Sequence, residues 1–372
     1  MQWVKLGDFI EQCDERNTNL VYGLGDIRGM TITKEVIPTK ANLDGNDLSK
    51  FLIVKPNDFI YNPRTHGKKI GLGLNTTDKA FLISWNNIAF RIKDTNVLNP
   101  EFLYMYFYRS EWDREACFQS WGSSTEVFAW NSLCLMRIPL PSIDEQKQVV
   151  AAWRGLKILG EQNEQMAGPL MDLCQSYLQD LKHKYPLVEI GGYIEECKER
   201  NGDGIYTDKD VNGVSITKQF IETRANMEGV SVLNYKCVKP KEFAYKTNTD
   251  GLGEDQIALA FNDTERTKLI SSIYTAFKIV SSEILPEYLF IWLVQSDFGR
   301  YARYNSWGSA REMFSIEDLC RYKIPVPPIE IQRAIVEIYN CARTSKYISE
   351  TAKKLNSDIC PALMRQIIGD NQ

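Results

Sequence analysis

Short apolar runs and long apolar stripes alternate along the chain and predict two kinds of segment. Runs rich in β-branched and aromatic residues, bounded by polar turn residues, are typical of strands. Amphipathic stretches that begin at a proline are typical of helices with proline in the first turn. The predicted strands include 51–54, 81–84, 89–92 and 270–274, and the predicted helices include 101–108 and 287–294.

Two longer stripes begin just after Pro141 and just after Pro328. Each extends over about 40 residues, which corresponds to about 60 Å of helix. A long helix with one apolar stripe needs a partner stripe, so we expect the two helices to pack as an antiparallel pair. The stripe positions are Val149, Trp153, Leu156, Leu170, Leu173, Tyr177 and Leu181 in the first helix, and Ile335, Ile338, Ile348, Ala352, Leu355, Ile359, Leu363 and Ile367 in the second.

The sequence also repeats itself. Val4–Glu11 returns 184 residues later as Val188–Glu195, and further along the shift becomes 186, pairing Ser120–Ser123 with Ser306–Ser309. Self-similarity that extends over most of a chain indicates a duplicated structural unit. Nearly the whole chain therefore consists of two diverged copies, each with a mixed part followed by a long helix.

These patterns predict an α+β fold. Two homologous mixed α/β domains are joined by two long helices packed as an antiparallel coiled-coil pair, with pseudo-twofold symmetry that places the domains at opposite ends. We expect the domains at 1–141 and 185–327, and the helices at 142–184 and 328–372.

Composition narrows the functional classes. The 372 residues are 44% apolar and 25% charged, which is typical of a soluble globular protein. No apolar run approaches the roughly 18 residues of a membrane span, and no signal-like stretch opens the sequence. Nine cysteines without a Cys-x-x-Cys pair favour reduced thiols in the cytoplasm. A net charge of −4 argues against an unassisted, non-specific DNA binder but allows local basic patches or phosphate contacts shared with partners.

Two proline-rich segments stand where each mixed part passes into its helix: Ile138–Gln146 (IPLPSIDEQ) and Ile324–Gln332 (IPVPPIEIQ). Both resemble the boundary motif of the specificity subunits of type I restriction-modification systems. Trp3–Asp8 is similar to the start of that family's recognition domain. The resemblance covers essentially the full chain, and two motifs that each end a homologous half are far more specific than one.

The resemblance implies a non-catalytic DNA-binding subunit. Each mixed domain would be a target-recognition domain that reads one half of a bipartite, asymmetric DNA target. The implied partners are double-stranded DNA, two adenine methyltransferase subunits and motor-nuclease (restriction) subunits. It also implies no cofactor in this chain, with S-adenosylmethionine, ATP and Mg bound by the partners. A duplicated chain suits this role because two reading domains on one face of a duplex contact half-sites about one helical turn, roughly 34 Å, apart.

Catalytic motifs are not found in the sequence. Gly67-Lys68-Lys69 lacks the Ser or Thr of a phosphate-binding loop, and His66 and His183 have no metal-ligand spacing. Asn99-Pro100-Glu101-Phe102 is similar to an adenine methyltransferase signature. Because it aligns with Leu285-Pro286-Glu287-Tyr288 in the second copy, we interpret it as a helix start.

The strongest candidate for DNA contact is the stretch Asn62–Lys69, whose counterpart Lys246–Gly251 differs in charge and length. Divergence between otherwise matched copies is expected of domains that read different sequences. Arg and Lys can read guanine, Asn can read adenine, and any of them can hold phosphate instead. A solvated hairpin loop is the structural alternative. The candidates in these stretches are Arg64, Thr65, His66, Lys68 and Lys69 in the first copy, and Lys246, Thr247, Asn248 and Thr249 in the second.

Other positions suggest further contacts. Basic residues shared between the copies suit phosphate anchoring, or else belong to a common turn scaffold; they are Arg28, Lys34, Lys40, Lys218 and Arg224. Trp121 and Trp307 recur at matched positions, which favours packing in a core or between domain and helix over a contact with DNA or a methyltransferase. Nearby Arg311 is a copy-specific candidate reader.

Two further matched residues, Gln146 and Gln332, lie just inside the long helices. They either cap the helices or contact a methyltransferase subunit. For the whole chain, the alternatives to a specificity subunit are a two-domain interaction scaffold that binds no DNA, or the recognition part of another restriction-type methyltransferase.

Overall fold

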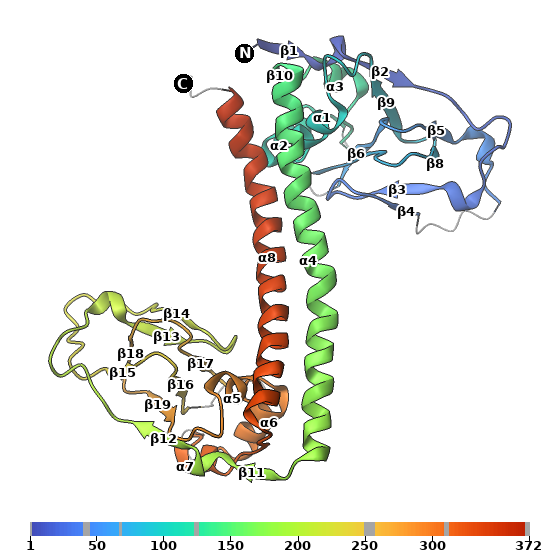
Figure 1. The fold of residues 1–372 in the computed structure, drawn as a ribbon. Helices are drawn as coiled ribbons and strands as arrows, with labels where there is room; N and C mark the ends of the chain where they lie inside the picture. Colours follow the sequence, from blue (N-terminus) through green and yellow to red (C-terminus); the bar gives the residue numbers. More distant parts are fainter. Residues whose placement is uncertain are drawn as a thin grey trace. The chain divides into compact units, whose positions relative to one another are not determined.

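The computed structural model of the chain describes residues 2–39, 45–66, 69–122, 126–248, 257–308 and 312–368. At residues 2, 66 and 357–368 it describes the backbone only. Contacts divide the chain into two compact units, one formed by residues 1–162 and 348–372 and the other by residues 163–347. Each unit holds one β-rich domain and parts of two long helices (Figure 1).

The domain of the first unit is built mainly from antiparallel strands. Its central sheet has the order β2-β9-β6-β7, and the domain also contains three two-stranded pairs, β1-β10, β3-β4 and β5-β8. The strands are β1 (Gln2–Lys5), β2 (Ile10–Cys13), β3 (Arg28–Met30), β4 (Val36–Pro38), β5 (Leu52–Val54), β6 (Phe59–His66), β7 (Lys69–Leu74), β8 (Phe81–Ile83), β9 (Ile88–Ile92) and β10 (Arg137–Leu140). The helices are α1 (Pro100–Phe107), α2 (Ser110–Phe118) and α3 (Trp130–Leu135).

The second unit repeats this topology. Its central sheet has the order β12-β19-β16-β17, and its two-stranded pairs are β11-β20, β13-β14 and β15-β18. The strands are β11 (Leu187–Glu189), β12 (Ile194–Cys197), β13 (Asn212–Val214), β14 (Phe220–Glu222), β15 (Lys236–Val238), β16 (Phe243–Lys246), β17 (Leu259–Phe261), β18 (Lys268–Ile270), β19 (Tyr274–Ile279) and β20 (Lys323–Pro325). The helices are α5 (Pro286–Leu293), α6 (Ser296–Tyr304) and α7 (Ile316–Cys320).

Most predicted elements are confirmed to within a residue or so at each end, but the predicted strand at 270–274 is wrong. β18 ends at Ile270 and β19 begins at Tyr274, and a turn joins them. Ile270 and Tyr274 belong to different strands, although the sequence pattern predicts one strand across them.

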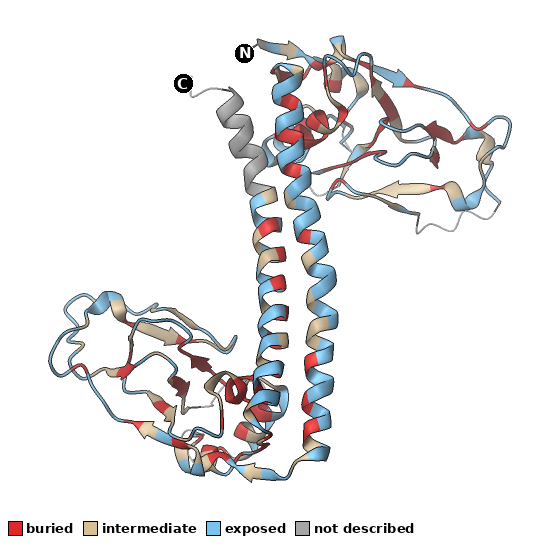
Figure 2. Ribbon diagram, in the orientation of Figure 1, coloured by how far each residue is buried: buried red, intermediate tan, exposed pale blue. Residues whose placement is uncertain are grey.

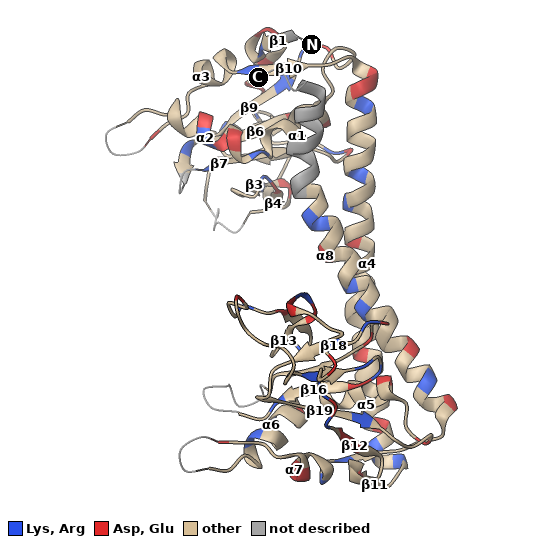
Figure 3. Cartoon of the chain, turned by 90° about the vertical axis from the view of Figure 1, so that its left-hand side faces the viewer, with Lys and Arg blue, Asp and Glu red and all other residues tan. Residues whose placement is uncertain are grey.

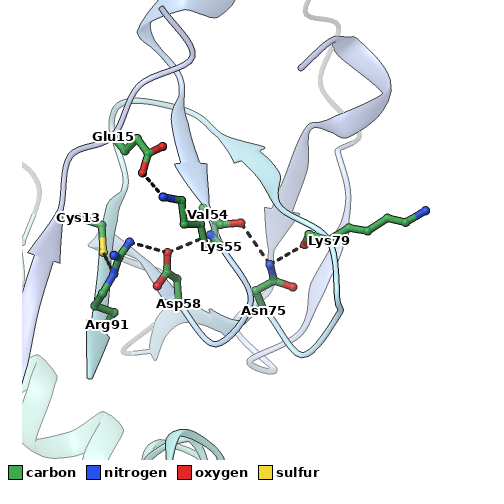
Figure 4. Close-up of polar contacts among 8 residues, drawn as sticks. All are labelled: Cys13, Glu15, Val54, Lys55, Asp58, Asn75, Lys79 and Arg91. Carbon is green, nitrogen blue, oxygen red and sulfur yellow. Dashed lines mark hydrogen bonds and ion pairs between the residues drawn. The ribbon is translucent and has the colours of Figure 1, made fainter. Parts of the chain in front are cut away.

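Polar contacts inside the first domain recur in the second. Lys55 pairs with Glu15 at 2.5 Å, and the Asn75 amide donates to the Val54 and Lys79 carbonyls (Figure 4). The second half has the equivalent pairs Lys239–Glu199 and Asn262 with Val238 and Arg266. Figure 4 also shows Arg91 reaching Asp58 and Cys13, and burial raises the pKa of the Cys13 thiol to about 11. These shared contacts hold the same strands together in both halves.

Two long helices follow the two domains, α4 (Ile143–Lys184) and α8 (Ile329–Ile368). Buried positions recur along α8 on the side that faces α4 (Figure 2). In the first unit, a Cβ built on Gly160 would lie 3.5 Å from the Cβ of Ala352. In the second unit, Cys174 and Leu178 share a core with Ile335 and Tyr339. The residue numbers descend on one helix as they rise on the other, so the paired helices are antiparallel, as predicted.

The details of the predicted stripes are partly wrong. Leu173, Tyr177 and Leu355 were expected in the seam, but all three are exposed. The buried positions on α8 recur every three or four residues as Ile335, Tyr339, Ala342, Ser345, Ser349 and Ala352. Small residues in this seam allow the close approach at Gly160. The predicted stripes are defined mainly by large apolar side chains and therefore omit most of these small residues. Basic and acidic residues are interspersed along the described parts of both helices (Figure 3).

Candidate nucleic-acid interface

The stretch Asn62–Lys69 is mostly strand rather than loop. β6 continues to His66 and β7 begins at Lys69, with Thr65 opposite Ile70 and His66 opposite Lys69. The pairing register shifts between Tyr61 and Thr65, and such a bulge re-aims side chains at the end of a strand. Arg64 and Lys69 are both exposed at this hairpin. The tip therefore offers two cations to an anionic ligand.

A second segment of the first domain joins this hairpin. The Phe128 N–H donates to the Pro63 carbonyl at 2.7 Å, and the Thr65 N–H donates to the Glu126 carbonyl at 3.2 Å. Arg64 lies directly opposite Val127 in an antiparallel bridge. Val127 in turn exchanges two backbone hydrogen bonds with Trp121. Two candidate stretches that are separate in the sequence thus form one three-stranded ribbon.

The second domain builds the same ribbon from different side chains. Asn248 lies opposite Met313, and Met313 lies opposite Trp307. The Phe314 N–H donates to the Thr247 carbonyl at 2.8 Å, which matches the Phe128–Pro63 bond of the first half. The backbone pairing therefore places Arg64 of one half and Asn248 of the other at equivalent positions. Arginine and asparagine are the residue types that pair with guanine and adenine respectively in the major groove.

The prediction that Trp121 and Trp307 pack in a core is wrong. Their side chains are 80% and 68% exposed. The core beneath the ribbons is made instead by Tyr61 with Phe128 and by Tyr245 with Phe314, each pair with ring centroids 6.0 Å apart. Recurrence at matched positions indicated a common role, but it did not distinguish an interior role from a surface one.

Lys34 is buried and paired with Asp113. The expected contact with a DNA phosphate would require this ion pair to break. Its ammonium group donates to Asp113 at 2.6 Å and to the Ile70 carbonyl at 2.8 Å. Burial lowers the pKa of Lys34, and the neighbouring Asp113 carboxylate partly opposes that effect. Lys218, its counterpart, is half-buried and donates to the Ile257 carbonyl at 2.7 Å. The scaffold alternative describes both lysines better than phosphate anchoring does.

The remaining candidates differ in their placement. The Arg28 guanidinium donates to the Gly25 and Ile27 carbonyls of its own turn and lines an open groove of the first unit. Arg224 is exposed, whereas Lys246 and Thr247 are half-buried at the end of β16 and just beyond it. Lys40, Lys68, Thr249, Arg311 and the side chain of His66 lie outside the described residues.

One solved structure matches this architecture over essentially its full length. The S subunit of the type I restriction-modification system from M. genitalium matches with a TM-score of 0.58 at 14% identity, over 100% of this chain and 97% of that one. The chain has the fold of a type I specificity subunit. This full-length match confirms the resemblance predicted from the two boundary motifs, together with the α+β fold class.

Two further solved structures match at lower similarity. HsdS from Thermoanaerobacter tengcongensis matches with a TM-score of 0.40 at 16% identity, over 100% of this chain and 97% of that one. A chain from a study of complex assembly and conformational transition of the type I R-M system has a TM-score of 0.40 at 15% identity, over 98% and 97%. No protein-family profile matches the sequence, and no curated protein matches it.

In this specificity-subunit fold, Gln146 fastens the first domain to its helix. The side chain is fully buried, donates to the Val97 and Pro141 carbonyls, and accepts the Asn99 N–H at 2.8 Å. Gln332 makes the matching bonds to Glu283, Pro327 and Leu285. Each amide bonds to a preceding loop and is inaccessible to another subunit, so neither simple capping nor a methyltransferase contact describes it.

The described residues also bear on three other kinds of feature: a methyltransferase-like motif, a metal site and a membrane-spanning helix. Asn99 caps α1 by accepting the Glu101 and Phe102 N–H groups, which supports its interpretation as a helix start. Within the described residues, no group of three or more His, Cys, Asp or Glu residues could hold a metal ion. None of the helices in that described part of the chain is long and apolar enough to cross a membrane.

Proposed function

We propose that the chain is the sequence-recognition subunit of a type I restriction-modification assembly. Each β-rich domain reads one half of a bipartite DNA target, with Arg64 and Asn248 at equivalent reading positions. The chain carries no reaction itself and directs two adenine methyltransferase subunits and restriction subunits to that target. Those partners bind S-adenosylmethionine, ATP and Mg.

One observation carries this proposal. The two halves share the backbone of the ribbon, including the Phe128 and Phe314 bonds, but differ in the residue at the equivalent ribbon position, Arg64 in one half and Asn248 in the other. Duplication without divergence would make both halves equivalent, whereas a common scaffold with exchanged side chains suits two different half-sites. The full-length specificity-subunit fold supports the same conclusion.

Exposed apolar side chains on α4 support the proposal that partner subunits bind this helix. Leu173 and Tyr177, four residues apart on α4, are both exposed. Neighbouring exposed apolar side chains are typical of protein–protein interfaces. Methyltransferase binding to the exposed face of the helix pair is therefore part of the proposal.

Methylome sequencing tests the proposed function. A host that carries the chain with its neighbouring methyltransferase is compared with a host from which only this chain is deleted. We expect the deletion to remove one split adenine-methylation motif, made of two short half-sites separated by unspecified bases. An unchanged methylome in a host where the methyltransferase is expressed would contradict the proposal.

A further inference from the structure

Each half exposes a matched set of apolar side chains beside its reading position. Trp121 and Val127 in the first half correspond to Trp307 and Met313 in the second, and all four are exposed. The last residues of α2 and α6 are also exposed aromatics at corresponding positions, Phe118 and Tyr304. Shared apolar residues such as Ile10 and Ile194, or Val54 and Val238, are buried in the cores of the two domains. A matched apolar set that is exposed therefore requires a different explanation.

The ribbon arranges these side chains in a row. Residues directly opposite one another on antiparallel strands project to the same face of a sheet. Arg64 lies opposite Val127, which lies opposite Trp121, so the three side chains form one row across the first ribbon. In the second ribbon the row is Asn248, Met313 and Trp307. Each row therefore has a variable polar end and a constant apolar end.

We propose that Trp121 and Trp307 are sequence-tolerant DNA contacts, which pack against base faces or deoxyribose next to each reading position. This inference rests on the proposed function. Side chains shared by two domains that read different sequences must contact what both half-sites have in common. Phosphates are common to all sites, but they are best bound by cations or by several hydrogen-bond donors, whereas a tryptophan offers one indole N–H on a large apolar ring system. Base faces and sugars are equally common, and aromatic stacking on them tolerates any sequence.

Continuity with the proposed reading surface favours DNA over a protein as the occupant. The tryptophan of the first ribbon lies in the same row as the Arg64 cation, and the exposed Lys69 lies at the tip of the adjoining hairpin. An anionic duplex held by those cations would lie along the row. A protein partner that used the tryptophans would have to share this surface with the DNA.

The test uses the full chain with Trp121→Ala, Trp307→Ala and the double substitution. Binding is measured by fluorescence anisotropy, over a series of salt concentrations, to a duplex that carries the methylated motif and to a scrambled duplex. We expect each single variant to bind both duplexes about tenfold more weakly. The salt dependence should keep its slope, because no phosphate contact and no released counterion is lost. Trp121→Phe should retain most of the affinity.

Tyr347→Ala is the matched control, because Tyr347 on α8 is as exposed as Trp307 (69% against 68%) but lies outside the ribbon. Salt-dependent binding by the wild-type chain with unchanged affinity in the tryptophan variants would overturn this inference and leave the proposed function standing. The same holds if the variants bind DNA normally but no longer copurify with the methyltransferase, which would mark the row as a protein interface. Absence of salt-dependent DNA binding by the wild-type chain would overturn both.

Discussion

Lys34 and Lys218 occupy matched turns, and each donates to a backbone carbonyl of the adjoining segment, Ile70 in one half and Ile257 in the other. Both residues also adopt positive φ angles, 66° and 63°. The lysine is therefore shared because both halves have the same local backbone structure, which its side chain stabilises. At the residue scale, identity between the halves indicates scaffold when the side chain is buried, and only exposure separates a scaffold role from a binding role.

The buried ion pair of Lys34 gives the first prediction. Lys34→Met should destabilise the first unit by about 3 kcal/mol, because Asp113 would keep a buried charge without its partner. Urea unfolding of the full chain measures the change. Lys55→Met is the control, since it breaks an exposed pair and should cost less than about 1 kcal/mol. Equal effects of the two substitutions would show that the Lys34 pair contributes no more than a surface pair.

Arg64 and Asn248 give the second prediction. Arg64→Asn should change one half of the methylated motif at a single position and leave the other half and the spacing intact. Loss of a bidentate contact to guanine costs about 1–3 kcal/mol of discrimination against the wrong base. Asn248→Ala should affect only the opposite half. Methylome sequencing of each variant reports both results, and a change in both halves from either substitution would contradict independent reading.

At the scale of elements, glycines in the two repeated openings explain part of the sequence similarity. Gly7 and Gly191 lie in short helical turns after β1 and β11. A Cβ at Gly7 would lie 2.7 Å from the Cβ of Cys134, and one at Gly191 would lie 2.8 Å from the Cβ of Cys320. The repeated glycine is therefore needed for close packing of the turn against α3 or α7.

The third prediction compares neighbouring glycines. Gly191→Ala should destabilise the second unit by about 1–3 kcal/mol, because the Cys320 side chain and carbonyl would have to move. Gly192→Ala should change the stability by less than about 0.5 kcal/mol, since a Cβ there has no neighbour within 4 Å. Thermal unfolding of the two variants measures the difference. Similar melting temperatures would show that the turn yields at little cost.

The sequence predicted those features of the fold that depend on periodicity and repetition. The duplicated topology, the proline-started helices and the antiparallel long helices follow from patterns that local physics imposes. The three-stranded ribbon could not be predicted, because Arg64 is far in sequence from Trp121 and Val127 and the strands meet through single bridges. Burial could not be predicted from residue type either. Lysine is usually exposed, but Lys34 is buried, and tryptophan is usually buried, but Trp121 is exposed.

At the scale of the whole molecule, the halves attach to their helices by interchangeable junctions. Gln146 accepts the Asn99 N–H and donates to Val97 in the first half. Gln332 accepts the Leu285 N–H and donates to Glu283 in the second. The donor and acceptors in each loop are backbone groups, so the junction does not depend on which loop residues supply them. A domain from one half should therefore dock on the helix of the other.

This interchangeability gives the last prediction. A chain in which residues 187–327 replace residues 3–141 ahead of α4 carries the second domain twice. Assembled with its methyltransferase, it should methylate a motif whose two half-sites are identical, and the antiparallel helices should make them an inverted repeat. Both half-sites should have the sequence of the wild-type half-site that Asn248→Ala alters. The wild-type chain expressed from the same vector is the control. Survival of the half-site assigned to Arg64 would contradict the assignment of one half-site to each domain.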